Sequence, residues 1–456
     1  MKVNPYIFRE YDIRGVVETD FPPEFVQHLG RAFGTFVSRN GGREISLSGD
    51  VRLTTPKLKD YFKTGVLSTG IDVIDIGILP TPANYFSMFK LEVSGAVQIT
   101  GSHNPPEMNG FKMSFDKSAV YGNQIQELRK IIETEDYETG EGTEISYPFQ
   151  EEYLEMLRGK ITLERPVKVA MDCGNAAACL VAPQFFRDIG IDLAELYCDV
   201  DGSFPNHHPD PTVPENLRDL IQLVKEGEYD VGIAYDGDAD RIGVIDDRGE
   251  VVWADTIMCL FLPELIEPGD EILFDVKCSQ SLEDTILKLG GKPVIWKTGH
   301  SLVKQKMKEL GCKFGGEMSG HLFFADDYFG YDDAIYVSAR LVQMLSRQEK
   351  KLSELVAELP TYYSTPEMRM ECPSDEEKFK IAEKAAEYFK SRYESLDIDG
   401  VRIKFEDGWG LVRASNTQPV IVCRFEAKSP ERMNEIKDIV LSKLQEMGEV
   451  SIPDDI

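Results

Sequence analysis

The chain has 456 residues, with 50 Lys and Arg against 79 Asp and Glu, so its net charge is −29. This length exceeds what one hydrophobic core supports, so we expect roughly three or four domains. Nucleic acids and anionic membrane surfaces bind concentrated positive charge, so the acidic balance argues against both as partners. Small anionic ligands remain open, because they need only a local basic pocket.

The cysteines and the apolar runs indicate the compartment. The eight cysteines are scattered, without a C-x-x-C pair, and most lie in apolar stretches. This pattern is typical of buried free thiols in a reducing compartment. The N-terminus lacks the apolar region of a signal peptide, and no apolar run approaches the roughly 20 residues that span a bilayer. We therefore expect a cytoplasmic protein.

A weak internal repeat organises the first two-thirds of the chain. Strand-like apolar runs alternate there with helical segments, which predicts α/β layers. Three of the predicted strands end in an aspartate, at 45–50, 167–172 and 272–275. A second predicted strand follows each of them, at 73–77, 191–197 and 294–296. The pattern predicts three related α/β units.

Breaks in composition indicate the domain boundaries. An acidic segment at 133–144, a turn at 246–249 and a stretch with two prolines at 362–374 are predicted connections. The last piece is predicted to be a helix at 375–393, three strands and a helix at 430–447, which together form a compact α+β unit. The expected domains are 1–148, 149–250, 251–366 and 367–456.

A serine stands in a loop dense with turn-forming residues. Residues 100–112 have the sequence T-G-S-H-N-P-P-E-M-N-G-F-K, with His103 beside the hydroxyl of Ser102 and Lys112 close behind. A serine in such a loop is most often a cap or a turn residue. The other motifs decide whether Ser102 does chemistry.

The residues around this loop predict its local structure. The apolar run 95–99 leads in as a buried strand. The pair Asn109-Gly110 predicts a tight turn. Beyond it, apolar and polar residues alternate over 111–115, which predicts a half-buried strand.

Three aspartates form the second motif. Asp236, Asp238 and Asp240 occupy a loop between two apolar runs. Three such carboxylates can merely be solvated surface, but packing them unpaired between buried strands would cost several kcal/mol. They can instead converge on one hard cation, and Mg²⁺ fits best because it accepts a few carboxylates and a phosphate oxygen. A calcium-binding EF-hand is excluded, because Arg241 stands where that loop needs glycine.

Two further loops offer binding groups. Residues 315–321, G-G-E-M-S-G-H, with 297–301 upstream, offer donors and acceptors matched to sugar hydroxyls, although a glycine turn with a surface Glu is the alternative. Residues 413–417, R-A-S-N-T, combine an Arg fork, hydroxyls and an amide in a candidate anion nest. The nucleotide-binding P-loop and Rossmann fingerprints are absent from the sequence. The four loops together indicate phosphoryl transfer on a sugar phosphate.

The four loops also resemble the signature loops of the α-D-phosphohexomutase superfamily. The matching segments are 100–105, 236–241, 316–321 and 413–417, supported by F-R-E-Y-D-I-R-G at 8–15, and the resemblance covers the whole chain. T-G-S-H-N-P together with Met318 is similar to the bacterial and archaeal phosphomannomutase/phosphoglucomutase branch. Amino-sugar mutases usually have Ala before the serine and Gln in the sugar loop. One departure is Ala239, where many relatives have glycine.

The resemblance implies a fold and a set of residue roles. It implies three related α/β domains with mixed sheets and a C-terminal α+β domain, arranged around a central cleft. Ser102 would be the phosphoserine, and its phosphate would hold Mg²⁺ together with Asp236, Asp238 and Asp240. Lys112, Arg241 and His300 would be the candidate catalytic acids and bases. The implied substrate-binding residues are Arg9, Tyr11, Arg14, His103, Lys277, Glu317, Ser319, His321, Arg413, Ser415, Asn416 and Thr417.

The implied activity is the interconversion of hexose 1-phosphate and hexose 6-phosphate, with mannose or glucose as the sugar. It would proceed through phosphoserine and a bound 1,6-bisphosphate, with hexose 1,6-bisphosphate as activator, in a monomer or a homodimer. Three alternatives stay open: an amino-sugar mutase, a sugar phosphatase and a non-catalytic sugar-phosphate sensor.

Overall fold

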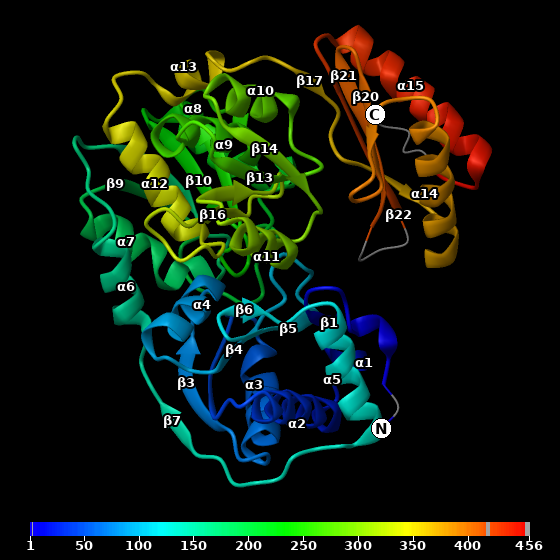
Figure 1. The fold of residues 1–456 in the computed structure, drawn as a ribbon. Helices are drawn as coiled ribbons and strands as arrows, with labels where there is room; N and C mark the ends of the chain where they lie inside the picture. Colours follow the sequence, from blue (N-terminus) through cyan, green and yellow to red (C-terminus); the bar gives the residue numbers. More distant parts are fainter. Residues whose placement is uncertain (2, 416–419, 452–456) are drawn as a thin grey trace. The chain divides into compact units, whose positions relative to one another are not determined.

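The computed structural model describes residues 1, 3–415 and 420–451. The chain divides into two compact units. The first comprises residues 1–254, 304–309 and 319–355, and the second comprises 255–303, 310–318 and 356–456. Figure 1 draws the chain in colours that follow the sequence. Among the described residues, no helix is long and apolar enough to cross a bilayer.

The first unit begins with a mixed seven-stranded sheet, in which β2 runs parallel to β3 and β4 while β5 runs antiparallel to β4. Its strands are β1 Ile13–Val16, β2 Glu44–Gly49, β3 Asp72–Ile78, β4 Gly95–Ile99, β5 Met108–Phe115, β6 Ser118–Ala119 and β7 Glu144–Ser146. Its helices are η1 Pro5–Ile7, α1 Val17–Asp20, α2 Pro23–Arg39, α3 Thr55–Leu67, α4 Thr81–Lys90 and α5 Asn123–Thr134. Helices α2 and α3 pack side by side (Figure 1).

The turn predicted at Asn109-Gly110 is wrong. Both residues lie inside β5, where Asn109 pairs with Gly15 and Gly110 pairs with Arg14 of β1. A Cβ atom on Gly110 would lie 2.7 Å from the Ile13 carbonyl oxygen, so glycine here permits close approach of two strands. Strand β5 is also buried along most of its length, rather than half-buried, since it lies inside the sheet between β1 and β4.

A second sheet of the first unit has the strand order β12-β11-β10-β8-β9. Its strands are β8 Lys168–Asp172, β9 Asp192–Leu196, β10 Val231–Tyr235, β11 Ile242–Asp246 and β12 Val251–Val252. The remaining elements of this unit are α6 Gln150–Arg158, η2 Ala177–Leu180, α7 Ala182–Asp188, η3 Pro214–Leu217, α8 Arg218–Glu226, β16 Leu322–Phe324 and α12 Ala334–Ser346. Helices α11 His300–Leu310 and α13 Leu352–Ala357 each cross from one unit to the other along the chain.

The second unit contains a parallel set of strands and a C-terminal antiparallel sheet. The parallel set has β13 Glu271–Asp275, β14 Lys292–Trp296 and β15 Phe314–Gly316, with helices α9 Ala254–Leu265 and α10 Gln280–Lys288. The C-terminal sheet has β17 Tyr363–Ser364, β18 Met368–Glu371, β19 Ser395–Leu396, β20 Val401–Phe405, β21 Gly408–Ala414 and β22 Val420–Ala427. Helices α14 Asp375–Lys390 and α15 Pro430–Met447 pack on this sheet (Figure 1).

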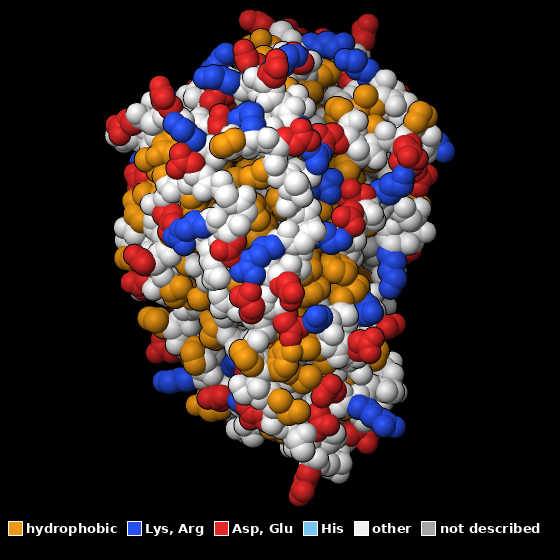
Figure 2. Space-filling view, turned by 90° about the vertical axis from the view of Figure 1, so that its left-hand side faces the viewer, with side chains coloured by type: hydrophobic (Ala, Val, Ile, Leu, Met, Phe, Trp, Pro, Cys, Tyr) orange, Lys and Arg blue, Asp and Glu red, His pale blue; other side chains and the backbone are white. Residues whose placement is uncertain are grey.

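The predicted repeat is confirmed, because β2, β8 and β13 each pair in parallel with the strand that follows, β3, β9 and β14. The connection predicted at 362–374 is wrong in part. It contains β17 and β18, and both pair with β22. On the face drawn in Figure 2, acidic and basic side chains are interspersed rather than gathered by sign.

Asp333 gives the first unit a titratable group in its interior. One carboxyl oxygen accepts the backbone N–H of Tyr336 at the start of α12, and the other accepts the hydroxyls of Tyr153 and Tyr328, both at 2.6 Å. Burial raises the pKa of Asp333 to about 6, although these hydrogen bonds oppose the shift. Folding therefore favours the protonated carboxyl.

Asp333→Asn is expected to change how stability depends on pH. The stabilisation from protonating Asp333 is fully present below the unfolded-state pKa of about 3.9 and is lost as pH rises through about 6. In the variant this contribution, on the order of 2 kcal/mol, should vanish from the urea midpoints measured between about pH 4 and about pH 7. Asn still caps α12. The exposed Asp192→Asn serves as the control, and parallel pH profiles for Asp333→Asn and the wild type would contradict the assignment.

Candidate active site

Ser102 lies in the loop that joins β4 to β5. Its backbone φ is +48°, in the left-handed region that disfavours residues other than glycine, and its side chain is buried. Its hydroxyl donates to Asp236 Oδ2 at 2.8 Å and lies 3.1 Å from His103 Nδ1. The fold thus brings the serine motif and the aspartate motif together, although 134 residues separate them.

His103 is neutral beside the serine. Burial lowers its pKa well below the usual value, and the positive charges of Arg241, Arg14 and Lys112 lower it further. The backbone carbonyl of His103 accepts a hydrogen bond from His208 Nε2. A neutral imidazole within reach of a hydroxyl can accept its proton, so His103 has more chemical capacity than the binding role that the sequence predicted.

The three aspartates occupy the loop between β10 and β11, which pair antiparallel. Their side chains are fully buried, and one oxygen from each lies within 4.8 Å of the others. Lys112 Nζ donates to Asp238 Oδ2 at 2.7 Å and to Asp240 Oδ2 at 2.5 Å. Within the described residues, the Oδ1 atoms of Asp238 and Asp240 are buried and accept no hydrogen bond. Three buried carboxylates with two free acceptor atoms and one ammonium fit a hard divalent cation.

The charged groups of this cluster shift one another's pKa values. Burial and the neighbouring carboxylates raise the pKa of Asp236 well above the usual value. Burial also opposes ionisation of Asp238, but the charge of Lys112 and its hydrogen bond outweigh it, so the pKa of Asp238 is lowered. Burial lowers the pKa of Lys112, but the negative charges of Asp238 and Asp240 raise it by more. The pKa of Lys112 therefore lies above its usual value. Lys112 therefore keeps its proton, which suits a charge stabiliser or proton donor rather than a base.

The other predicted residues of the first unit lie in the aspartate loop, at the end of the predicted sugar loop, and in or just before β1. Arg241 Nε donates to His321 Nε2 at 2.9 Å, and His321 Nδ1 lies 2.9 Å from Asp332 Oδ2. The backbone N–H of Ile242 donates to the carbonyl of Gly320, so the end of the predicted sugar loop, with Ser319, adjoins the aspartate loop. Arg14 pairs with Asp12 at 2.5 Å, and Arg9 and Tyr11 lie in the turn before β1.

The second unit holds the remaining predicted residues. Glu317 is buried, and its Oε1 accepts the backbone N–H of Gly299 at 2.5 Å. Burial lowers the pKa of Lys277, but Glu367 and Asp275 outweigh it and raise the pKa. His300 is the first residue of α11. Arg413 Nε donates to Asp399 at 3.0 Å and Ser415 is buried, whereas Asn416 and Thr417 lie outside the described residues.

Sequence reasoning missed three residues that hold the motifs in place. Thr81 donates from its backbone N–H to the carbonyl of Asp238 and from its hydroxyl to the carboxylate, at 2.9 and 2.5 Å. Asp50 and Arg52 bond the loop of Ser102. Only Asp50 had a signal in the sequence, because an aspartate ends each of the three predicted first strands.

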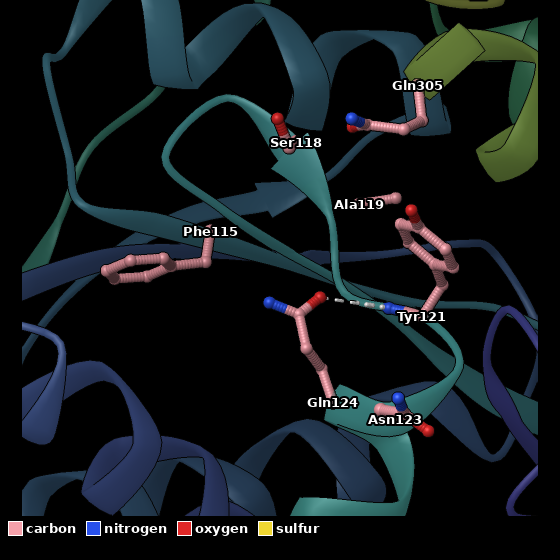
Figure 3. A pocket seen from close by; sticks show the side chains of 7 residues that line it. All are labelled: Phe115, Ser118, Ala119, Tyr121, Asn123, Gln124 and Gln305. Carbon is pink, nitrogen blue, oxygen red and sulfur yellow. Dashed lines mark hydrogen bonds between the residues drawn. The ribbon is translucent and has the colours of Figure 1, made fainter.

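A separate pocket of about 340 Å³ also lies in the first unit. Figure 3 shows its lining, from the β5–β6 hairpin, the start of α5 and Gln305 of α11. The Gln124 side chain accepts the backbone N–H of Tyr121 there at 3.4 Å. The lining residues carry no formal charge, so this pocket does not suit a phosphate.

Comparison with known proteins matches the chain over nearly its whole length. Four family models match in order: phosphoglucomutase/phosphomannomutase alpha/beta/alpha domains I, II and III at residues 5–139, 151–249 and 253–363, and the C-terminal domain at 367–443. A Pseudomonas aeruginosa phosphomannomutase/phosphoglucomutase is 43% identical over 96% of this chain and 95% of its own length. A Neisseria meningitidis phosphoglucomutase is 39% identical over 95% of each chain.

A solved structure agrees with these relatives. The crystal structure of a phosphoglucomutase/phosphomannomutase family protein from Burkholderia thailandensis has a TM-score of 0.92 and 40% identity, and the match covers 99% of this chain and all of that one. The fold and the matched motifs define an enzyme of the isomerase class that transfers a phosphoryl group within its substrate. The chain belongs to the phosphoglucomutase/phosphomannomutase family of the α-D-phosphohexomutase superfamily, as its four loops predicted.

Proposed function

We propose that the protein interconverts the 1-phosphate and 6-phosphate of glucose or mannose by way of phospho-Ser102. The observation that carries this proposal is the contact of the Ser102 hydroxyl with Asp236, inside a buried carboxylate cluster that Lys112 partly neutralises. Phospho-Ser102 transfers its phosphoryl group to the free hydroxyl of the hexose phosphate, which forms a 1,6-bisphosphate. The bisphosphate reorients and returns its other phosphoryl group to Ser102, which leaves the isomeric monophosphate.

The residues of the first unit have distinct roles in this proposal. Asp236, Asp238 and Asp240, with the phosphate of Ser102, hold the metal, and Mg²⁺ is the ion we propose. When bound, it supplies positive charge that offsets the charge of the transferring phosphoryl group. Lys112 adds a fixed positive charge beside the same carboxylates. Neutral His103 can take or return the proton of a hydroxyl at Ser102, whereas Arg241 and His300 remain candidates for the proton of the sugar hydroxyl.

The remaining motif residues recognise the sugar and its second phosphate. Glu317 accepts hydrogen bonds from sugar hydroxyls, and Ser319 donates to them or accepts from them. The phosphate that does not react is bound by Arg413, Ser415, Asn416 and Thr417. Burial of the Glu317 and Arg413 side chains supports defined rather than solvated positions. Arg9, Tyr11, Arg14, Lys277 and His321 complete the proposed substrate-binding set.

The four family matches support a division of these roles by domain. Residues 1–148 carry the phosphoserine, 149–250 the metal ligands, 251–366 the sugar-binding loop and 367–456 the phosphate-binding loop. A hexose 1,6-bisphosphate serves as the activator, because it phosphorylates Ser102 when the serine has lost its phosphoryl group to water.

A coupled assay tests the proposal with mannose 1-phosphate, glucose 1-phosphate and glucosamine 1-phosphate in parallel, with Mg²⁺ and a trace of glucose 1,6-bisphosphate. We expect the 6-phosphates of glucose or mannose to form without release of inorganic phosphate. Turnover of the amino sugar alone would favour the amino-sugar mutase. Release of phosphate would favour a phosphatase, and binding without turnover of any of the three would favour a sensor.

A further inference from the structure

A buried arginine donates hydrogen bonds to the backbone carbonyls of the serine loop. The Arg52 side chain is 1% exposed. Its Nη2 donates to the carbonyls of Ser102 at 2.7 Å and Asn104 at 2.5 Å. Its Nη1 donates to the carbonyls of Pro105 at 2.7 Å and Met108 at 3.1 Å. One planar guanidinium thus fixes three peptide units of the loop and one at the start of β5, which the single-point ammonium of a lysine could not do.

Asp50 binds the same loop at its start. Its Oδ2 accepts the Thr100 hydroxyl at 2.7 Å and the Gly101 backbone N–H at 3.1 Å. Its Oδ1 accepts the Thr55 hydroxyl and the Arg52 backbone N–H, at 2.6 and 3.0 Å. The carboxylate also lies 3.2 Å from Arg52 Nε, so each buried charge has the other as its partner. Neither group touches the Ser102 hydroxyl.

We propose that Asp50 and Arg52 are a positioning pair that holds the Ser102 loop in the geometry required for phosphoryl transfer. The inference rests on the proposed function of Ser102 and adds two residues to it. They act through the loop backbone, and the transferred phosphoryl group does not touch them.

The loop conformation requires such support. The left-handed φ of Ser102 is a strained conformation, which persists only when neighbouring contacts enforce it. In a trans peptide the C=O and N–H point in opposite directions, so a Ser102 carbonyl held by Arg52 turns the His103 N–H away from the guanidinium. A Cβ atom at Gly101 would lie 2.5 Å from Arg52 Cζ, so the loop and the guanidinium are fitted to each other.

The repeat gives this pair a counterpart in the second unit. Asp275 is the last residue of β13, and Asp50 directly follows the last residue of β2. Asp275 accepts the backbone N–H of Met318 at 3.2 Å and the hydroxyl of Thr298 at 3.0 Å. The sequence D-V-R at 50–52 corresponds to D-V-K at 275–277. In these two of the three repeats the aspartate at the strand end thus binds a loop that carries a functional motif, which is the behaviour expected of a positioning residue.

The test compares Arg52→Met and Arg52→Lys with Lys59→Met. Lys59 is a matched control, because it is a buried cation on α3 whose partners, Asp75 and the Gly77 carbonyl, lie on β3 and not in the serine loop. We expect Arg52→Met to lower kcat on the order of 100-fold with little change in KM, because misplacing a reacting group by about 1 Å has that effect. Arg52→Lys should recover part of the loss. Lys59→Met should keep the wild-type kcat per folded molecule.

A second measurement separates positioning from stability. Phospho-Ser102 prepared with glucose 1,6-bisphosphate is followed by intact-protein mass spectrometry, and its transfer to glucose 1-phosphate should slow in Arg52→Met as much as kcat does. If Arg52→Met does not fold, Asp50→Asn replaces it, since it keeps the side-chain shape and removes the charge, and a loss of kcat is again expected. Wild-type kcat in folded Arg52→Met or Asp50→Asn would contradict the positioning role of Asp50 and Arg52. An equal loss of kcat in Lys59→Met would contradict it as well. Failure of wild-type protein to phosphorylate Ser102 would instead contradict the proposed function.

Discussion

Replacing Ser102 by alanine is expected to reduce the isomerisation of glucose 1-phosphate by about four orders of magnitude or more, because the covalent route depends on this hydroxyl. The Ser102 hydroxyl is bonded to Asp236 within the carboxylate cluster, and water bound in its place could not hold a phosphoryl group between the two half-reactions. The dehydrogenase-coupled rate of 6-phosphate formation measures the effect.

Stability should change little in this variant, because alanine removes one oxygen and leaves the backbone contacts of Arg52 and Asp50 in place. Ser114→Ala is the matched control, since Ser114 is a buried serine of β5, in the same sheet. It should retain the wild-type rate. Full isomerase activity in Ser102→Ala would rule out the phosphoserine mechanism.

Removing divalent cations is expected to abolish turnover, and adding Mg²⁺ should restore it. The physical reason is the buried set of Asp236, Asp238 and Asp240, in which two carboxylate oxygens accept no hydrogen bond within the described part of the chain. An ion that binds only the folded protein also stabilises it, by about 2.7 kcal/mol at about 100 times its Kd. Mg²⁺ should therefore raise the thermal midpoint of the chelator-treated protein, which gives a readout independent of activity.

Asp238→Asn should lose both the activity and the Mg²⁺-dependent rise in the thermal midpoint. Asp246→Asn is the matched control, because Asp246 is a buried aspartate of the adjoining strand β11 that accepts backbone N–H groups. It should keep the response to Mg²⁺. An equal thermal shift in Asp238→Asn and the wild type would place the ion elsewhere.

The sequence predicted the helices and strands whose ends are set by residues close to them in the chain. Helix α15 begins and ends where predicted, since Ser429 caps it and Pro430 stands at its first position. The strands that end at Asp172 and Asp275 were marked by apolar runs and a following turn. At Asn109-Gly110 the same kind of signal failed, because pairing with β1 outweighs the turn preference of the dipeptide, and only the fold reveals that partner.

In the candidate site, too, some residues were predictable from the sequence and others were not. Ser102, Lys112 and the aspartate loop were predictable because their residue types and order match a known family, and the structure brings them within hydrogen-bond distance. Arg52 was not predictable, because its partners are backbone carbonyls, which leave no pattern of side chains in the sequence. Asp50 was visible as the end of a repeated strand, but its contact with the loop depends on how β2 and β4 pair.

Each turnover is expected to pass through phospho-Ser102, and a rapid-quench labelling experiment tests this expectation most directly. The protein would be phosphorylated with glucose 1,6-bisphosphate that carries labelled phosphate and then mixed with unlabelled glucose 1-phosphate. Peptide mass spectrometry would locate and follow the label. We predict that the label lies on Ser102 and leaves it at a rate at least equal to kcat. Label on another residue, or loss from Ser102 far slower than turnover, would contradict the account.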